Sequence, residues 1–277
     1  MLAVCQFKPR RGARNANLTA LTALATRALE GGARLLVLPE MCATGYRFPN
    51  PEAIRPMAEA PRGATFRTFA PLAKQHRAHI VVGFVEDFEG RLFTAAMVSG
   101  PDGRLEALYR KRLLYIDDHT WANPGDLPYP VFKTPYGTAT VGICMDINDP
   151  RFLTHIRRTR PDLVCFPTNW VDEGTDPQPY WVQQLRGWGG TLVAADRWGE
   201  EDGVVFAGRS AVIRGGAVLA SAPAVGDGWW GIKPGAPEDE RAVVTAPLQA
   251  PSMAVPDAQG PQVPDSPAGR AEGLPTE

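Results

Sequence analysis

The sequence has few cysteines, almost no net charge and no long apolar stretch. Its cysteines lie without C-x-x-C spacing at Cys5, Cys42, Cys144 and Cys165, which argues against a zinc ribbon, a redox pair and a disulfide framework. A net charge of −1 gives no strong field that would attract nucleic acid or anionic lipid. No run approaches the roughly 18 apolar residues of a membrane span. We therefore expect neither nucleic acid nor a membrane as a partner.

Length and composition favour a folded α/β protein. The 277 residues, 44% of them hydrophobic, are enough to bury a sizeable core. A strand-like segment, residues 2–7, follows Met1 directly, and no secretory signal pattern is present, so we expect a reduced, cytoplasmic location. Residues 1–250 are predicted to form one domain. Residues 251–277, rich in Pro, Gly and Ala, are predicted to be a disordered tail.

The hydrophobic pattern predicts strands that alternate with helices. A helix with Asn15 or Asn17 as its cap is expected to end at Gly31, and a second helix is expected over Ala64–His76, a third after Pro150. Strands are predicted at 35–38, 80–85, 91–99, 105–112, 138–143, 162–166 and 191–195. A final antiparallel set is predicted at 209–213, 216–220 and 241–245. Residues 113–130 show no periodicity and predict a long surface loop of the kind that is often functional.

Three reactive residues each come directly after a predicted strand or at its end. Glu40 follows 35–38, Lys111 lies next to the end of 105–112, and Cys144 follows 138–143. Ligand crevices in α/β sheets form at strand ends. A carboxylate, an ammonium and a thiol that meet there supply a base, a charge stabiliser and a nucleophile. The set predicts cleavage of a carbon–nitrogen bond through an acyl-thiol intermediate.

Each of these residues would have a defined task. Apolar neighbours of Glu40 favour a pKa raised towards neutrality, which suits a base that takes the thiol proton. Lys111 and the backbone amide of Met145 are the candidate oxyanion donors. The structural alternatives are ordinary ones: Cys144 as a packing residue, Lys111 as a solvated charge and Glu40 as a turn cap.

The chain resembles the nitrilase superfamily of carbon–nitrogen hydrolases over residues 2–222. The resemblance rests on blocks around the three reactive residues and on later segments: residues 36–41 with 44–46, 109–111, 142–146, 167–170, 196–199 and 206–210. It implies an α-β-β-α sandwich that forms a homodimer or higher homo-oligomer and needs no metal or organic cofactor. It also implies that Glu40, Lys111 and Cys144 are the catalytic triad.

The sequence departs from the family pattern at two positions. Where the family commonly has a second glutamate, six residues before a Pro-Gly, this chain has Asp118. Its side chain is one methylene shorter, which leaves its reach to Lys111 open, with Asp117 as an alternative. Asp196 stands where many relatives carry asparagine, a change expected to alter local hydrogen bonding.

Two stretches, 109–115 and 142–148, look most like the branch that deamidates N-terminal asparagine or glutamine. The expected substrate is therefore a peptide N-terminus or a small-molecule amide. The alternatives within the family are an ω-amidase, an N-carbamoyl amine hydrolase and a nitrilase. Substrate-binding candidates are Asp146, Asn169 and Trp170, with Trp181 as a second possible wall. A carboxylate for the substrate's α-ammonium could come from Asp146, Asp149, Asp117 or Asp172, and Asp146 could instead anchor the segment after Cys144.

Three other interpretations remain open from the sequence. A Cys–His enzyme would use His119 or His155 as its base. A binding protein could keep the hydrolase fold without its chemistry. A metal hydrolase is poorly supported, because His76 and His79 are the only paired histidines and no acidic cluster accompanies them.

Overall fold

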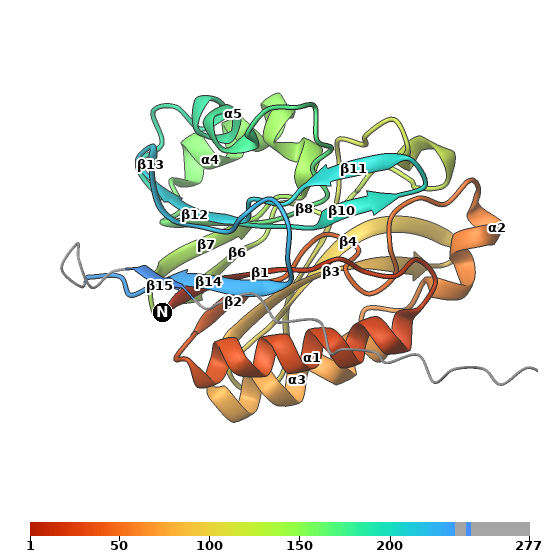
Figure 1. Ribbon diagram of the computed structural model, residues 1–277, viewed down its shortest axis with the longest axis horizontal. Coiled ribbons are helices and arrows are strands. Elements are labelled where there is room, and N and C mark those ends of the chain that lie inside the picture. The colour runs from red at the N-terminus through yellow and green to blue at the C-terminus, as the bar shows by residue number, and fades with distance from the viewer. Residues whose placement is uncertain (236–241, 245–277) are drawn as a thin grey trace, which may run out of the picture.

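The computed structural model describes residues 1–235 and the backbone of residues 242–244. The predicted tail, 251–277, and the boundary at residue 250 lie outside these residues. Two sheets pack face to face, and a pair of helices covers the outer side of each (Figure 1). This is the α-β-β-α sandwich that the sequence predicted. No helix in the described part of the chain is long and apolar enough to cross a membrane.

The first sheet has the strand order β15-β14-β1-β2-β3-β4-β5. Strands β1, β2 and β3 are parallel, and the others join antiparallel. Its strands in chain order are β1 (Leu2–Gln6), β2 (Leu35–Val37), β3 (His79–Phe88), β4 (Arg91–Ser99), β5 (Leu105–Arg110), β14 (Gly228–Ile232) and β15 (Ala242–Val244).

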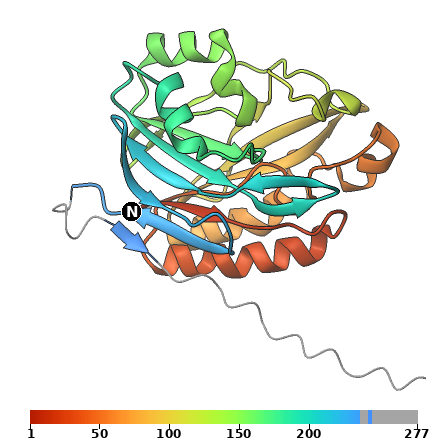
Figure 2. The same ribbon diagram turned by 45° about the horizontal axis from the view of Figure 1, so that its top comes forward.

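The second sheet has the order β13-β12-β9-β8-β7-β6, with β7, β8 and β9 parallel. A separate two-stranded ribbon, β10–β11, is the teal hairpin of Figure 2. The strands are β6 (Val131–Thr134), β7 (Gly137–Val141), β8 (Leu163–Thr168), β9 (Thr191–Asp196), β10 (Trp198–Glu201), β11 (Val204–Ala207), β12 (Ala211–Arg214) and β13 (Ala217–Ser221).

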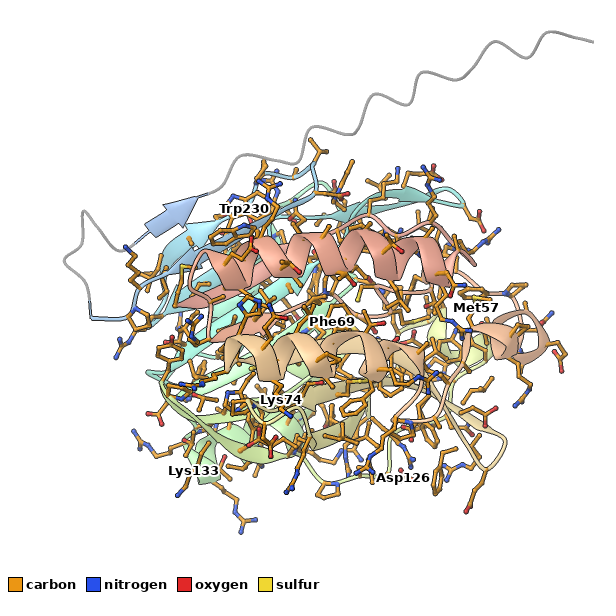
Figure 3. The ribbon with its side chains drawn as sticks, turned by 90° about the horizontal axis from the view of Figure 1, so that it is seen from below. Met57, Phe69, Lys74, Asp126, Lys133 and Trp230 are labelled. Carbon is orange, nitrogen blue, oxygen red and sulfur yellow. The ribbon has the colours of Figure 1, made fainter. Side chains whose placement is uncertain are left out.

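Helices α1 and α3 lie side by side on the first sheet (Figure 3), and α4 and α5 cover the second. The longer helices are α1 (Arg14–Glu30), α3 (Ala64–His76), α4 (Pro150–Thr159) and α5 (Pro177–Gln184). Short helical turns are α2 (Pro51–Ile54), η1 (Arg55–Met57), η2 (Asp118–Thr120) and η3 (Cys144–Asn148).

The alternation of side chains along β1 shows how the layers are held. Leu2 and Val4 pack into the core between the two sheets, whereas Ala3 and Cys5 pack under the helices. Successive strand residues point to opposite faces, so a continuous apolar strand serves both layers at once. Burial on both faces explains why these strands read as unbroken hydrophobic runs.

Most predicted elements are confirmed, and two details are wrong. Helix α1 begins at Arg14 after Ala13 and has no side-chain cap. Asn15 and Asn17 both lie within the helix, where Asn17 is buried and donates from Nδ2 to the carbonyls of Arg10 and Ala43. The segment predicted at 241–245 does form a strand, but β15 pairs with β14 in the first sheet and not with β12 and β13.

The fold leaves no room for a side chain at Gly83, where β3 passes beneath the turn that holds Glu40. A Cβ there would lie 2.5 Å from the Cα of Glu40 and 2.5 Å from the carbonyl oxygen of Pro39. Contacts this short force the backbone of one segment to move. Glycine at this position therefore lets β3 approach the Glu40 turn closely.

We predict that Gly83→Ala lowers the free energy of unfolding by about 1–3 kcal/mol, the usual cost of overpacking. Chemical denaturation of wild type and variant measures the difference. Gly189→Ala is the matched control, since no atom beyond its two chain neighbours lies within 4 Å of the position that a Cβ would take there. Its free energy of unfolding should change by no more than about 0.5 kcal/mol. Equal stability of Gly83→Ala and wild type would contradict the close approach.

Candidate active site

The three reactive residues meet at the edge where strands of both sheets end. Glu40 follows β2, Lys111 follows β5, and Cys144 follows β7 and opens η3. Lys111 Nζ donates to Glu40 Oε1 over 2.8 Å. The side chains of Glu40 and Lys111 are fully buried, and Cys144 is 5% exposed. Residues far apart in the chain thus share one buried site, as the sequence predicted.

Asp118 completes the surroundings of the ammonium group. Its Oδ2 accepts from Lys111 Nζ over 2.6 Å and from the amide of Tyr115 over 2.9 Å. The shorter aspartate side chain therefore reaches the lysine, because η2 brings it close. Asp117, the alternative, instead forms an ion pair with Arg47 at 3.3 Å.

The protonation of this cluster follows from burial and pairing. Burial raises the pKa of Glu40 to about 7, although Lys111 lowers it. Burial by itself lowers the pKa of Lys111, but Asp118 and Glu40 outweigh burial and raise it well above its ordinary value. The lysine therefore stays charged, while Glu40 can gain or lose a proton near neutral pH.

Cys144 has a backbone conformation that side chains rarely adopt. Its φ is +46°, in the left-handed region, which costs free energy for a residue other than glycine. Burial and then the charge of Glu40 raise the pKa of the Cys144 thiol, while Lys111 lowers it. The thiol is protonated at neutral pH, so it needs a base before it can attack.

Asp146 holds the segment after Lys111 against the segment that carries Cys144. Its carboxylate accepts from the amides of Arg112, Leu113 and Ile143, each at 3.0 Å, and from the Tyr109 hydroxyl at 2.8 Å. Both oxygens are therefore satisfied inside the protein. This geometry favours the anchoring role over direct binding of substrate.

A cavity of about 300 Å³ opens onto Cys144. Asn169 and Trp170 line it together with Met145. Trp181 is instead fully buried in the core and packs edge-on against Trp170, with their ring centroids 5.7 Å apart. The backbone N–H of Asn169 donates to Glu40 Oε2 over 2.9 Å. The strand end of β8 thus positions Glu40 and contributes to the cavity wall.

Asp196 holds the backbone of Trp170, which lines the cavity. Its Oδ1 accepts from the Trp170 amide over 2.9 Å, and burial raises its pKa well above the ordinary value. A protonated carboxyl group here offers both a donor and an acceptor, as the side chain of asparagine would.

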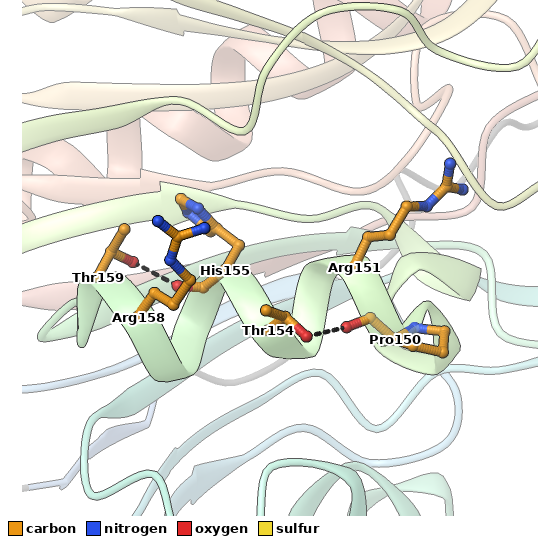
Figure 4. A pocket seen from close by; sticks show the side chains of 6 residues that line it. All are labelled: Pro150, Arg151, Thr154, His155, Arg158 and Thr159. Atoms are coloured by element: carbon orange, nitrogen blue, oxygen red, sulfur yellow. Dashed lines mark hydrogen bonds between the residues drawn. The ribbon is translucent and has the colours of Figure 1, made fainter.

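The histidines do not lie in this cavity. His155 lines a separate hollow of about 630 Å³ along α4 (Figure 4). Its Nε2 lies 3.0 Å from the Thr140 hydroxyl, and His119 is exposed. The geometry gives neither histidine a place beside Cys144. Within the described residues, no group of three or more His, Cys, Asp or Glu side chains could hold a metal ion.

Several further lining residues were not among the predicted site residues, and Tyr115, Asn148, Glu173 and Tyr180 belong to them. Tyr115 lies in the predicted loop 113–130, and the length of that loop was the one sign in the sequence that it contributes to the site. Glu173 and Tyr180 lie near or on α5, which carries no clear apolar periodicity. Their place in the cavity depends on how α5 packs, which a local pattern does not contain.

Comparison with known proteins identifies the family of this chain. The carbon–nitrogen hydrolase family model matches residues 1–230. A nitrilase of Pyrococcus abyssi is 31% identical over 212 residues, which cover 76% of this chain and 80% of that protein. A protein N-terminal amidase of Schizosaccharomyces pombe is 26% identical over 263 residues, covering 77% and 92%.

A solved structure is similar as well. It is a mutant of the Nesterenkonia sp. AN1 amidase with the acetamide moiety of fluoroacetamide added covalently at its active-site cysteine. It superposes with a TM-score of 0.72 and 25% identity, over 82% of this chain and 87% of that one. This chain therefore belongs to the carbon–nitrogen hydrolase family. It is a hydrolase of C–N bonds, which disfavours the non-enzymatic alternative.

We predict that Lys111→Met lowers the free energy of unfolding by about 3–5 kcal/mol near pH 8, because two buried carboxylates lose their counter-ion. Without the lysine, the folded-state pKa of Glu40 rises further above its unfolded value. The folded protein then holds protons that the unfolded chain releases, so stability falls as pH rises.

Denaturation of Lys111→Met near pH 5 and near pH 8 measures this effect, and the deficit should shrink at the lower pH. Lys133→Met is the control, since Lys133 is exposed on β6 and its loss should change stability little at either pH. A deficit that is independent of pH would contradict the pairing argument.

Proposed function

We propose that this protein hydrolyses a carboxamide through a thioester on Cys144 and releases ammonia. The observation that carries the proposal is the buried Glu40–Lys111 pair at 2.8 Å, next to a thiol that opens onto a cavity. Base, charge stabiliser and nucleophile are the three functions that acyl transfer to sulfur requires. The similar Nesterenkonia amidase, with its covalently modified cysteine, supports a covalent route.

In the first half of the reaction, Glu40 takes the thiol proton and the sulfur attacks the carbonyl carbon. A C–S bond forms and the carbonyl oxygen becomes negative. Lys111 Nζ and the Met145 amide hold this oxyanion; Met145 lies in the first turn of η3, where amides have no partner within the helix. One such donor is worth about 3–4 kcal/mol in the transition state.

In the second half, the C–N bond breaks and the leaving nitrogen takes the proton from Glu40, so ammonia departs. Glu40 then accepts a proton from water, which attacks the thioester carbon. The C–S bond breaks, the acid is released and the proton returns to the thiol. Asp118, bonded to Lys111 at 2.6 Å, keeps the ammonium group in place throughout.

The substrate is proposed to be a small amide or a peptide with N-terminal asparagine or glutamine. The similarity to the Schizosaccharomyces pombe protein N-terminal amidase supports the peptide. The ω-amides, N-carbamoyl amines and nitriles stay as alternatives, because the same three groups can act on each of these carbon centres. We further propose that the protein acts in the cytoplasm as a homodimer or higher homo-oligomer, which sedimentation at several concentrations tests.

We predict that Cys144→Ala abolishes ammonia release, because the nucleophile is lost. The panel holds peptides with N-terminal Asn or Gln, amino-acid amides, 2-oxo acid amides, N-carbamoyl amines and nitriles. Wild-type turnover of at least one class, absent in the variant, is the expected result. Rapid quench followed by mass spectrometry should find the acyl group on Cys144.

Two controls sharpen this test. Cys165→Ala removes a buried thiol of β8 that packs between the sheets, and it should keep turnover. His155→Ala should keep it too, since a Cys–His enzyme alone would need that ring. Turnover without any acyl adduct would sink the covalent route.

We predict that kcat/KM rises with pH through a midpoint at about 7, the raised pKa of Glu40. Below the midpoint Glu40 is protonated and cannot act as the base, whereas Lys111 stays charged. Asp118→Asn removes a negative charge that raises the Glu40 pKa, so its midpoint should move to lower pH. A flat profile between about pH 6 and about pH 8 in the wild type would contradict Glu40 as the base.

A further inference from the structure

The cavity above Cys144 is acidic at its outer end. Among the described residues that line it, Glu173 and Asp176 are acidic and no side chain is basic. Asp176 caps α5 by accepting from the backbone N–H of Gln178 at 2.9 Å. Its carboxylate also forms an ion pair with the guanidinium group of Arg209 at 3.8 Å. Glu173 has no such ion pair in the described part of the chain, so its negative charge faces the cavity unmatched.

Aromatic side chains line the same cavity. Trp170 and Tyr180 stand together, with ring centroids 5.7 Å apart, and Tyr115 also lines it. The Tyr180 hydroxyl donates to Asn148 Oδ1 over 2.6 Å, which holds this ring in place. Ring faces attract cations, and a nearby carboxylate adds to that attraction. The negative face of a ring gives a carboxylate no such attraction.

The inner end of the cavity has a different character. Asn169 is 3% exposed, and its Nδ2 and Oδ1 have no hydrogen-bond partner in the described structure. A buried amide group with both ends unsatisfied is costly unless a ligand pairs with it. Asn169 therefore suits the amide end of a substrate beside Cys144, which leaves the other end of the substrate towards Glu173.

We propose that this cavity selects amides whose far end carries a protonated amine, and that Glu173 is the residue that determines this charge preference. This inference rests on the proposed function. It favours a substrate with an α-ammonium or a terminal ammonium group, and it disfavours amides that carry a carboxylate. Asp146, Asp149, Asp117 and Asp172, the carboxylates considered from the sequence, do not line the cavity.

Three amides of equal length test the preference: 5-aminopentanamide, hexanamide and adipamate, which differ only in a positive, neutral or negative end group. We expect kcat/KM to decrease in that order. In Glu173→Gln, the ratio of kcat/KM for the cationic amide to that for the anionic amide should fall by roughly fourfold, since the loss of one exposed charge changes each kcat/KM by about twofold. Raising the ionic strength should lower the wild-type ratio.

Glu30→Gln is the matched control, because Glu30 is an exposed carboxylate at the end of α1, and it should leave the ratio unchanged. Glu173→Lys should reduce the ratio further than Glu173→Gln. A peptide with N-terminal Gln, compared with its N-acetylated form, distinguishes an α-ammonium from a terminal ammonium as the recognised group.

Binding to Cys144→Ala separates this inference from the proposed chemistry. Calorimetry should show that 5-aminopentanamide binds to Cys144→Ala more tightly than adipamate does. This difference in affinity should be smaller in Cys144→Ala/Glu173→Gln. Tighter binding of the cationic amide, with no turnover of any amide by the wild type, would overturn the proposed function and support the charge preference. Equal turnover or binding of the three amides, or a preference for adipamate, would overturn the charge preference alone.

Discussion

The ammonium group of Lys111, buried between two carboxylates, is the interaction on which the site depends. It joins Glu40 after β2 to Asp118 in η2, and Glu40 in turn accepts from the backbone of Asn169 at the end of β8. Charges taken out of water are tolerated only where each has a close partner. The electrostatic requirement therefore sets the positions of three loops from two sheets.

Another buried carboxylate, that of Asp146, also joins separate segments, but through backbone groups. It joins the segment after Lys111 to the segment that begins with Cys144. Burial raises its pKa to about 6, while its hydrogen bonds lower that pKa. The partners differ: Glu40 and Asp118 accept from a lysine ammonium group, whereas Asp146 accepts mainly from backbone amides.

The sequence contained most of the fold and the centre of the site, for identifiable reasons. Apolar runs such as Leu35–Val37 predict buried strands, and reactive residues at their ends predict a shared edge. The pairing of β15 with β14 was missed because Gly228–Ile232, with two glycines and two tryptophans, does not read as a strand. Likewise, Glu173 and Tyr180 reach the cavity only through the packing of α5, which no periodicity encodes.

The chemistry and the outer cavity come from different parts of the chain. Glu40, Lys111 and Cys144 stand at strand ends whose geometry the core fixes, whereas Glu173 lies exposed in the connection before α5. Exposed connections accept substitution more readily than buried strand ends. The specificity of this scaffold can therefore diverge through surface changes that leave its strained nucleophile undisturbed, which makes the connection before α5 the natural place to redesign it.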